Sequence, residues 1–234
     1  MSAPATQPPS HGVAVPAAIG VVVAAVVAVM VVVGLVVSLT EDRLPTGPAL
    51  PPPPAPVAEV TFRSSTLQAD YAGISARLPT LPYVCPSSPE TVSPLLTSGV
   101  VCSAPVHPDY EGTADWTATA GFGAVADDLA GATAEATAKS FFDTFRGAGF
   151  GSRKTTLTDQ RTEQTDVDGR QVALISGNVG YQVAGVPSTY DRVLVVALPL
   201  DDGGYAIYFS SRPNDTPKPT LDVLNQSINS LYYG

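Results

Sequence analysis

The stretch from Val13 to Leu39 contains no charged residue and consists mainly of valine and alanine. At about 1.5 Å per residue, a helix of this length exceeds the roughly 30 Å hydrocarbon core of a bilayer. In lipid, each unpaired backbone polar group costs several kcal/mol, which favours a helix despite the β preference of valine. The run therefore predicts one transmembrane helix at residues 13–39.

A cleaved signal peptide is the main alternative for this run. Signal peptides begin with a basic region and have an apolar core of about 7–15 residues. Residues 1–12 contain no lysine or arginine, and the apolar run is much longer than such a core. A lipid-modified cysteine is also disfavoured, because no cysteine lies near the end of the run. We therefore expect the segment to be retained in the mature protein.

Three small residues, Gly20, Ala24 and Ala28, repeat at four-residue spacing within the run. Such a small-xxx-small stripe lets two transmembrane helices approach closely. The same spacing arises readily by chance in a segment built of valine and alanine. Self-association of two copies through this stripe is thus one alternative, beside a span that packs only against lipid.

The remainder of the chain divides into a tail, a linker and one domain. Residues 1–12 are expected to form a short disordered cytoplasmic tail. Residues 40–58 form a linker whose proline tract, at residues 45–56, favours a semi-rigid polyproline II spacer. Residues 59–234 then leave room for one domain. The formal net charge of −9 argues against nucleic acid as a partner, since a basic face is needed to neutralise phosphates.

Cys85 and Cys102 are the two cysteines of the chain, and both lie in the expected domain. An even count behind a membrane span predicts a disulfide in an oxidising compartment. A loop of this size would contribute about 3 kcal/mol of stability in the chain-entropy model. Two unpaired buried thiols are the alternative.

The positive-inside rule places basic residues near a span on the cytoplasmic side. Arg43 is the one basic residue close to this span, and it weakly favours a cytoplasmic C-terminal domain.

We give the cysteines more weight than Arg43 and expect a single-pass protein of the cell membrane. Its N-terminus would be cytoplasmic and its C-terminal domain extracytoplasmic. Few of the basic residues are lysines, a bias that we interpret as a sign of a GC-rich bacterial genome; the lysines are Lys139, Lys154 and Lys218.

Strand and helix signals alternate along the domain. Trp116, Ala118, Ala120 and Phe122 recur at a period of two, which predicts a half-buried strand with these side chains on one face. Strands are expected at residues 71–79, 114–125, 155–164, 170–183, 189–200 and 205–211. The pattern predicts an α+β domain, an antiparallel β-sheet with helices packed on its faces.

Two helices are expected beside these strands. One runs from about Asp128 to Arg146, with Phe142 and Phe145 on its core face, and ends at Gly147 and Gly149. The other closes the chain, with a cap at Thr216 or Thr220. Its apolar residues lie on one stripe, formed by Leu221, Leu224, Ile228 and Leu231.

The motif Y-x-I-S-x-x-L-P at residues 71–79 and the sequence LNQSINSL at residues 224–231 resemble the Mog1/PsbP-like fold. They are similar in particular to its actinobacterial lipoprotein and proline-rich secreted branch. The resemblance covers about residues 71–233, and the membrane span and the inserted segment from Cys85 to Cys102 depart from that branch. It implies an α+β domain outside the membrane with a binding or accessory role, and it carries over no active site.

Few residues suggest chemistry. His107 is the one histidine of the domain, with Asp109 two residues on, and a Ser–His–Asp arrangement with a distant serine is one hypothesis. An exposed loop residue between two prolines is the other, and we favour it. The acidic stretches at residues 166–169 and 201–204 lack the ligand ladder of a calcium loop, so turns are expected there. The sequence thus predicts no catalytic, cofactor-binding or metal-binding residue and no cofactor.

These observations favour a non-enzymatic binding or accessory protein, anchored in the bacterial cell envelope. Its partners would be the lipid bilayer and either another envelope protein or a small apolar ligand. An uncharacterised envelope hydrolase is one alternative, and it predicts a deep pocket lined by acids of raised pKa. A carrier of a small apolar ligand is another. It predicts a continuous apolar cavity where Phe142, Phe145 and Trp116 meet.

Overall fold

The computed structural model describes residues 58–110 and 115–234. The described residues belong to one compact unit, residues 56–234. The predicted tail, the span at residues 13–39 with Gly20, Ala24 and Ala28, and nearly all of the linker therefore lie outside the described residues. In the part that the structure describes, no helix combines the length and apolar character needed to cross a membrane.

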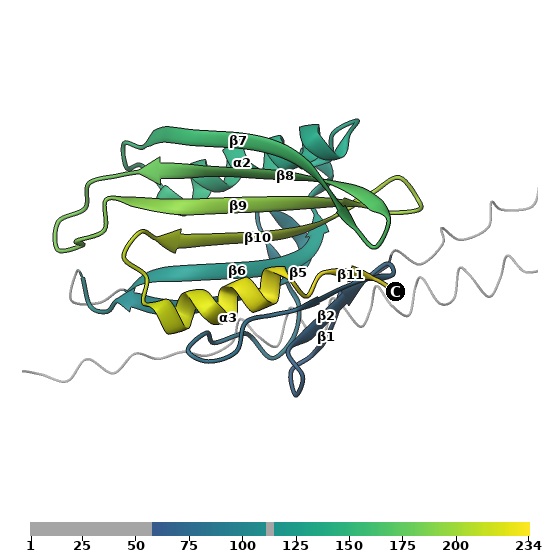
Figure 1. Cartoon of the computed structure of the whole chain (residues 1–234), viewed down its shortest axis with the longest axis horizontal. Helices are drawn as coiled ribbons and strands as arrows, with labels where there is room; N and C mark the ends of the chain where they lie inside the picture. The colour runs from purple at the N-terminus through teal and green to yellow at the C-terminus, as the bar shows by residue number, and fades with distance from the viewer. Residues whose placement is uncertain (1–57, 111–114) are drawn as a thin grey trace, which may run out of the picture. The chain divides into compact units, whose positions relative to one another are not determined.

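A seven-stranded antiparallel sheet forms the centre of the domain (Figure 1). The strand predicted at residues 155–164 is β7 (Thr156–Val167), which lies at one edge of the sheet and has almost all of its side chains exposed. The order of the strands across the sheet is β4 (Glu90–Val92), β5 (Leu96–His107), β6 (Trp116–Val125), β10 (Tyr205–Pro213), β9 (Tyr190–Pro199), β8 (Arg170–Gly180) and β7 (Thr156–Val167).

A small four-stranded sheet packs against the large one. Ala69 and Ile74 of the small sheet share a buried cluster with Ala120 and Phe122 of β6. The small sheet is formed, in order, by β1 (Thr61–Arg63), β2 (Gln68–Tyr71), β3 (Ile74–Arg77) and β11 (Tyr232–Tyr233).

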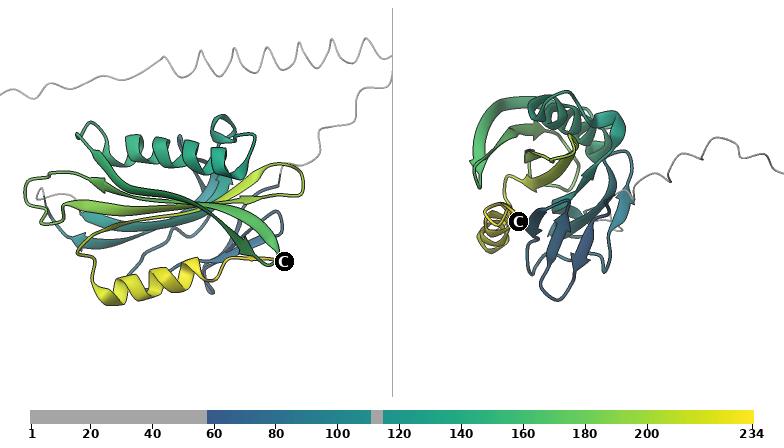
Figure 2. Two further views of the ribbon diagram at one scale, coloured as in Figure 1. Left: turned by 45° about the horizontal axis from the view of Figure 1, so that its top comes forward. Right: turned by 90° about the vertical axis from the view of Figure 1, so that its right-hand side faces the viewer.

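The two α-helices lie on opposite faces of the large sheet (Figure 2). Helix α2 (Ala134–Phe150) covers one face, where Phe141, Phe142 and Phe145 pack against Phe209 and other side chains of the sheet. Helix α3 (Lys218–Ile228) and the small sheet cover the other face. Both faces of the central strands are therefore buried, and the predicted α+β class is confirmed for the described residues.

Helix α2 differs from the prediction at both ends. A 3₁₀ turn, η1 (Asp127–Leu129), stands where the helix was expected to begin. The α-helix starts after Thr133, whose hydroxyl oxygen accepts a hydrogen bond of 3.1 Å from the backbone N–H of Ala136. The helix also continues past Gly147 and Gly149, because glycine is tolerated inside a helix that buries an apolar face. It ends at Gly151, which has a φ of 58°.

The strand predicted at residues 71–79 is instead a hairpin. Tyr71 ends β2, and Ile74 begins β3. The two turn residues between them both have positive φ, 48° at Ala72 and 83° at Gly73. This is the conformation that a two-residue hairpin turn requires, and the alternating side chains gave no sign of it.

Trp116 was predicted to share a face with Ala118, Ala120 and Phe122, and this prediction is wrong. The three other side chains lie in the core under α3 and the small sheet, whereas Trp116 joins the core under α2. Trp116 begins β6, beside an irregularity in the pairing with β5 between Pro105 and His107. The strict alternation of a regular strand does not extend to this position.

Cys85 and Cys102 form a disulfide with an S–S distance of 2.04 Å, as predicted. It joins the loop after β3 to the buried centre of β5. The two acidic stretches are turns, also as predicted. The Asp166 carboxylate accepts a hydrogen bond from the N–H of Gly169, and the Asp202 carboxylate accepts one from the N–H of Gly204.

Candidate functional site

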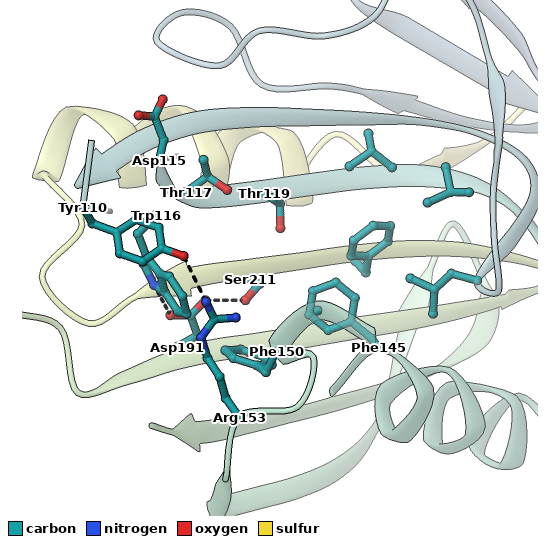
Figure 3. A pocket seen from close by; sticks show the side chains of 15 residues that line it. Tyr110, Asp115, Trp116, Thr117, Thr119, Phe145, Phe150, Arg153, Asp191 and Ser211 are labelled. Carbon is teal, nitrogen blue, oxygen red and sulfur yellow. Dashed lines mark hydrogen bonds between the residues drawn. The ribbon is translucent and has the colours of Figure 1, made fainter. Parts of the chain in front are cut away.

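A cavity of about 310 Å³ lies between the C-terminal half of α2 and the large sheet (Figure 3). Phe145 and Phe150 enter it from the helix, while β6, β9 and β10 supply the opposite wall. The side chains that determine its chemistry are Trp116, Phe145, Phe150, Asp191, Phe209 and Ser211. Phe142 packs in the core beside the cavity rather than in its lining.

Aromatic rings gather at the end of the cavity where β6 begins. The Trp116 ring lies 4.7 Å from the ring of Tyr181, centroid to centroid, and 6.3 Å from that of Phe150. Tyr110 meets Trp116 edge to face at 5.6 Å. Such contacts favour fixed ring positions, because each ring edge carries partial positive charge and each face partial negative charge. The aromatic wall is therefore held in place by its own packing.

One carboxylate, that of Asp191 in β9, lies among these rings and is only 4% exposed. The Tyr181 hydroxyl donates a 2.6 Å hydrogen bond to Asp191 Oδ1, and the Ser211 hydroxyl donates a 2.8 Å bond to Oδ2. The Trp116 indole Nε1–H points at both Tyr181 and Asp191, 2.8 Å from the hydroxyl and 3.4 Å from Oδ1. Three side chains thus converge on Asp191. Trp116 comes from β6, Ser211 from β10, and Tyr181 from just beyond the end of β8.

Burial is the main influence on the acidity of this group. It raises the pKa of Asp191 above the ordinary value of 3.8, although the hydrogen bonds from Tyr181, Ser211 and Trp116 act in the opposite direction. Burial and the neighbouring carboxylate also raise the pKa of the Tyr181 hydroxyl, so that it keeps its proton and acts as a donor. Among the described residues, no lysine, arginine or histidine forms an ion pair with Asp191.

Two further polar groups lie at the cavity. Arg153, which follows α2, donates a 3.0 Å hydrogen bond to the Tyr110 hydroxyl, and its guanidinium carbon lies 5.5 Å from the centroid of the Trp116 ring. The Thr119 hydroxyl of β6 is buried in the lining and has no hydrogen-bond partner among the described residues. A buried polar atom without a partner is costly, and a ligand atom or water would satisfy it.

His107 was expected to be an exposed loop residue, which is wrong: it ends β5, and its side chain is only 16% exposed. The structure brings it together with a serine and an aspartate, Ser188 and Asp215. The His107 Nε2 atom lies 2.6 Å from Ser188 Oγ and 3.1 Å from Asp215 Oδ1. The Ser188 hydroxyl also donates to the same Asp215 oxygen. Asp109, the carboxylate nearest in sequence, is not a partner of His107 among these bonds.

This cluster lacks the connectivity of a nucleophilic triad. In a triad the serine and the aspartate bind opposite nitrogens of the imidazole, whereas here both bind Nε2. Ser188 is also only 2% exposed, which leaves no room for a substrate. Partial burial acts to raise the pKa of Asp215, but the hydrogen bonds from Ser188 and His107 outweigh it, and this pKa is lowered. The cluster ties β5 to the loop before β9 and to the turn before α3.

The described residues contain no group of three or more histidine, cysteine, aspartate or glutamate side chains that could hold a metal ion. Asp191 and Tyr181 were missed by the sequence reasoning. One signal was available, because Asp191 is an acidic residue near the start of a strand whose run from Val193 onward is strongly apolar. Its role depends on Tyr181 and Ser211, which reach it from other parts of the chain.

No protein-family model and no curated protein matches this chain. Among solved structures, the solution structure of cyanobacterial PsbP (CyanoP) from Synechocystis sp. is similar, with a TM-score of 0.43 and 17% sequence identity. The match covers 80% of this chain and 100% of that chain. Cyanobacterial PsbP has the PsbP-like fold that the sequence motifs of this chain resemble. The narrower resemblance to the actinobacterial branch stays a prediction.

Proposed function

We propose that this protein is a membrane-anchored, extracytoplasmic binding module that holds a small ligand, mostly apolar with one polar end, in the cavity between α2 and the large sheet. The observation that carries the proposal is the buried Asp191 carboxylate at an aromatic cavity wall. Ligand sites are typically concave, apolar and about 300–1,000 Å³ in volume, with a few convergent polar groups. The cavity, at about 310 Å³, has this composition at the small end of that range.

The polar groups of the cavity suit recognition at one end of a ligand. Phe145 and Phe150 offer apolar surface, while Asp191 offers acceptor oxygens to a donor group. The buried Thr119 hydroxyl offers a further hydrogen bond that no described residue uses. A ligand that is apolar at one end and a hydrogen-bond donor at the other would match both walls.

The location of the domain is supported by the sequence and the cysteines. The uncharged run at residues 13–39 is long enough to span a bilayer, and the proline-rich linker would hold the domain away from it. The disulfide between Cys85 and Cys102 suits an oxidising compartment outside the cytoplasmic membrane of a bacterium. An accessory role towards another envelope protein is compatible with this arrangement.

One observation favours the hydrolase alternative, because Asp191 is a buried acid of raised pKa that lines a cavity. Among the described residues its hydrogen-bond partners are, however, Tyr181, Ser211 and Trp116, and none of these is a histidine or a second carboxyl that could complete an acid–base pair. The His107 cluster has its serine buried and both partners on one nitrogen. We therefore place binding first. Turnover of an envelope substrate that is lost in Asp191→Asn would reverse this order.

Native mass spectrometry of the full chain, purified from its own membranes in detergent, tests the binding function. A Thr119→Phe variant would fill the cavity from β6 without removing a hydrogen bond to any residue that the structure describes. The matched control is Thr162→Phe, which changes an exposed threonine of the edge strand β7. We expect a co-purified small molecule in wild type and in the control, and its loss in Thr119→Phe. Equal ligand content in all three proteins, or none in wild type, would contradict the proposal.

A further inference from the structure

The hydrogen bonds at Asp191 favour the ionised carboxylate, whereas its burial opposes ionisation. Tyr181, Ser211 and Trp116 all present donors to the carboxyl oxygens, and such donors favour the ionised form. All three donors are neutral groups, so they satisfy the lone pairs without balancing the charge. An ionised carboxylate in an apolar site is costly unless a positive charge accompanies it.

No described residue supplies that positive charge. Arg153, the basic side chain that lines the cavity, places its guanidinium at the Tyr110 hydroxyl and over the Trp116 ring. None of the ion pairs between described residues includes Asp191. A positively charged group that enters the cavity could therefore balance the negative charge of Asp191.

The aromatic wall suits a cation as well. Faces of tryptophan and tyrosine rings attract ammonium and guanidinium groups, and a carboxylate within a set of such rings strengthens the attraction. The centroid of the Trp116 ring lies 4.7 Å from that of Tyr181 and 6.3 Å from that of Phe150, so the three rings form one group. The position of Arg153 shows that the Trp116 ring accepts a cation on one of its faces.

We propose that the ligand of this cavity is a small organic cation, a protonated amine whose N–H groups donate to Asp191 while its apolar part lies against Phe145 and Phe150. The inference rests on the proposed function, since it names the ligand class of the same cavity. A neutral hydroxyl could donate a hydrogen bond to Asp191 too. It would add a fourth neutral donor and leave the charge unbalanced, so the amine is the better match.

The test uses Trp116, which is the one tryptophan of the chain, so that its fluorescence reports directly on the cavity. The full chain in lipid nanodiscs would be titrated with 2-phenylethylamine and with 2-phenylethanol, which share the same apolar part. The proteins compared are wild type, Asp191→Asn and Thr119→Phe. We expect the amine to bind wild type at least about tenfold more tightly than the alcohol. Asp191→Asn should remove this preference, and Thr119→Phe should weaken both probes.

The possible failures separate the two proposals. If amine and alcohol bind wild type equally and both are weakened by Thr119→Phe, the cavity binds ligands but the amine inference is wrong. If neither probe binds and no small molecule co-purifies with wild type, the binding function itself is overturned. If Asp191→Asn does not fold, the comparison of amine and alcohol on wild type decides the inference alone.

Discussion

The Tyr181 hydroxyl and the Asp191 carboxylate are joined by a 2.6 Å hydrogen bond in the buried wall of the cavity. Tyr181 lies just beyond the end of β8, and Asp191 lies near the start of β9, so the loop between these strands is closed by their contact. The same hydrogen bond holds the Asp191 carboxylate, a hydrogen-bond acceptor, beside the rings of Tyr181 and Trp116. It therefore contributes both to the stability of the ends of β8 and β9 and to the proposed binding of a ligand.

Removing the Tyr181 hydroxyl should destabilise the domain. In Tyr181→Phe, Asp191 Oδ1 keeps only the 3.4 Å hydrogen bond from Trp116, and the Trp116 N–H loses its 2.8 Å acceptor; poorly satisfied buried polar groups cost about 1–3 kcal/mol. The free energy of unfolding from urea denaturation measures the loss. Tyr190→Phe is the matched control, because that tyrosine is adjacent in the fold but 36% exposed. Equal free energies for the two variants would show that the bond contributes nothing to stability.

The stability difference between wild type and Asp191→Asn should depend on pH. Because the pKa of Asp191 is raised in the folded protein, the contribution of this group is fully present below its ordinary value of 3.8. It is lost as the pH rises through the raised pKa. Asp215 and Tyr181, the titratable groups that act on Asp191, are present in both proteins.

We therefore expect the thermal midpoint of wild type, relative to that of Asp191→Asn, to fall as the pH rises through that window. Thermal unfolding of both proteins from about pH 3 to about pH 8 measures this difference. A difference that does not vary with pH would mean that the folded protein leaves the pKa of this carboxyl unshifted.

Reduction of the disulfide should lower the stability of the described domain. Cys85 and Cys102 are 17 residues apart in the sequence, and their disulfide closes the loop between them. Disulfides typically contribute about 2–4 kcal/mol to the free energy of unfolding. Thermal unfolding with and without a reducing agent measures the effect on wild type. The double variant Cys85→Ala, Cys102→Ala serves as the control and should be insensitive to the reductant. A wild-type midpoint that does not move on reduction would contradict the expectation.

The proposed orientation predicts which side of the membrane exposes the linker. A protease added to intact spheroplasts should cut within residues 40–58 and release a fragment that carries residues 59–234. Detection of that fragment in the supernatant, with an antibody against the domain, is the measurement. A cytoplasmic marker protein must stay intact in the same sample. If the chain is cut only after the spheroplasts are lysed, the domain lies on the cytoplasmic side.

Much of the second half of the fold could be predicted from the sequence. The polar run of β7 and the apolar runs of β8, β9 and β10 are distinct in the sequence, and Asp-Gly turns such as that at Asp168–Gly169 mark where the chain reverses. The bounds of α2 were harder to predict, because Asp127 and Thr133 are both suitable caps and only packing selects the second. The hairpin turn at Ala72 could not be predicted, since alanine rarely adopts a positive φ.

The candidate site was predicted only in part. Phe145 and Trp116 do meet at a cavity, as the carrier hypothesis expected, but Trp116 reaches it through an irregular strand end. The buried role of Asp191 depends on Ser211, twenty residues along the chain, which becomes its neighbour only through the pairing of β9 and β10. Periodicity reports which face a residue occupies, not which distant partner it meets there.

The central claim is that a ligand enters the cavity beside Trp116, and NMR of the single indole N–H measures this most directly. The Trp116 Nε1–H group donates to Tyr181 and points at Asp191, so a ligand bound there must change its chemical shift. Titration of the full chain with 2-phenylethylamine should move this resonance to saturation in wild type and leave it in place in Thr119→Phe. An indole resonance that does not move at saturating amine in wild type would contradict the account.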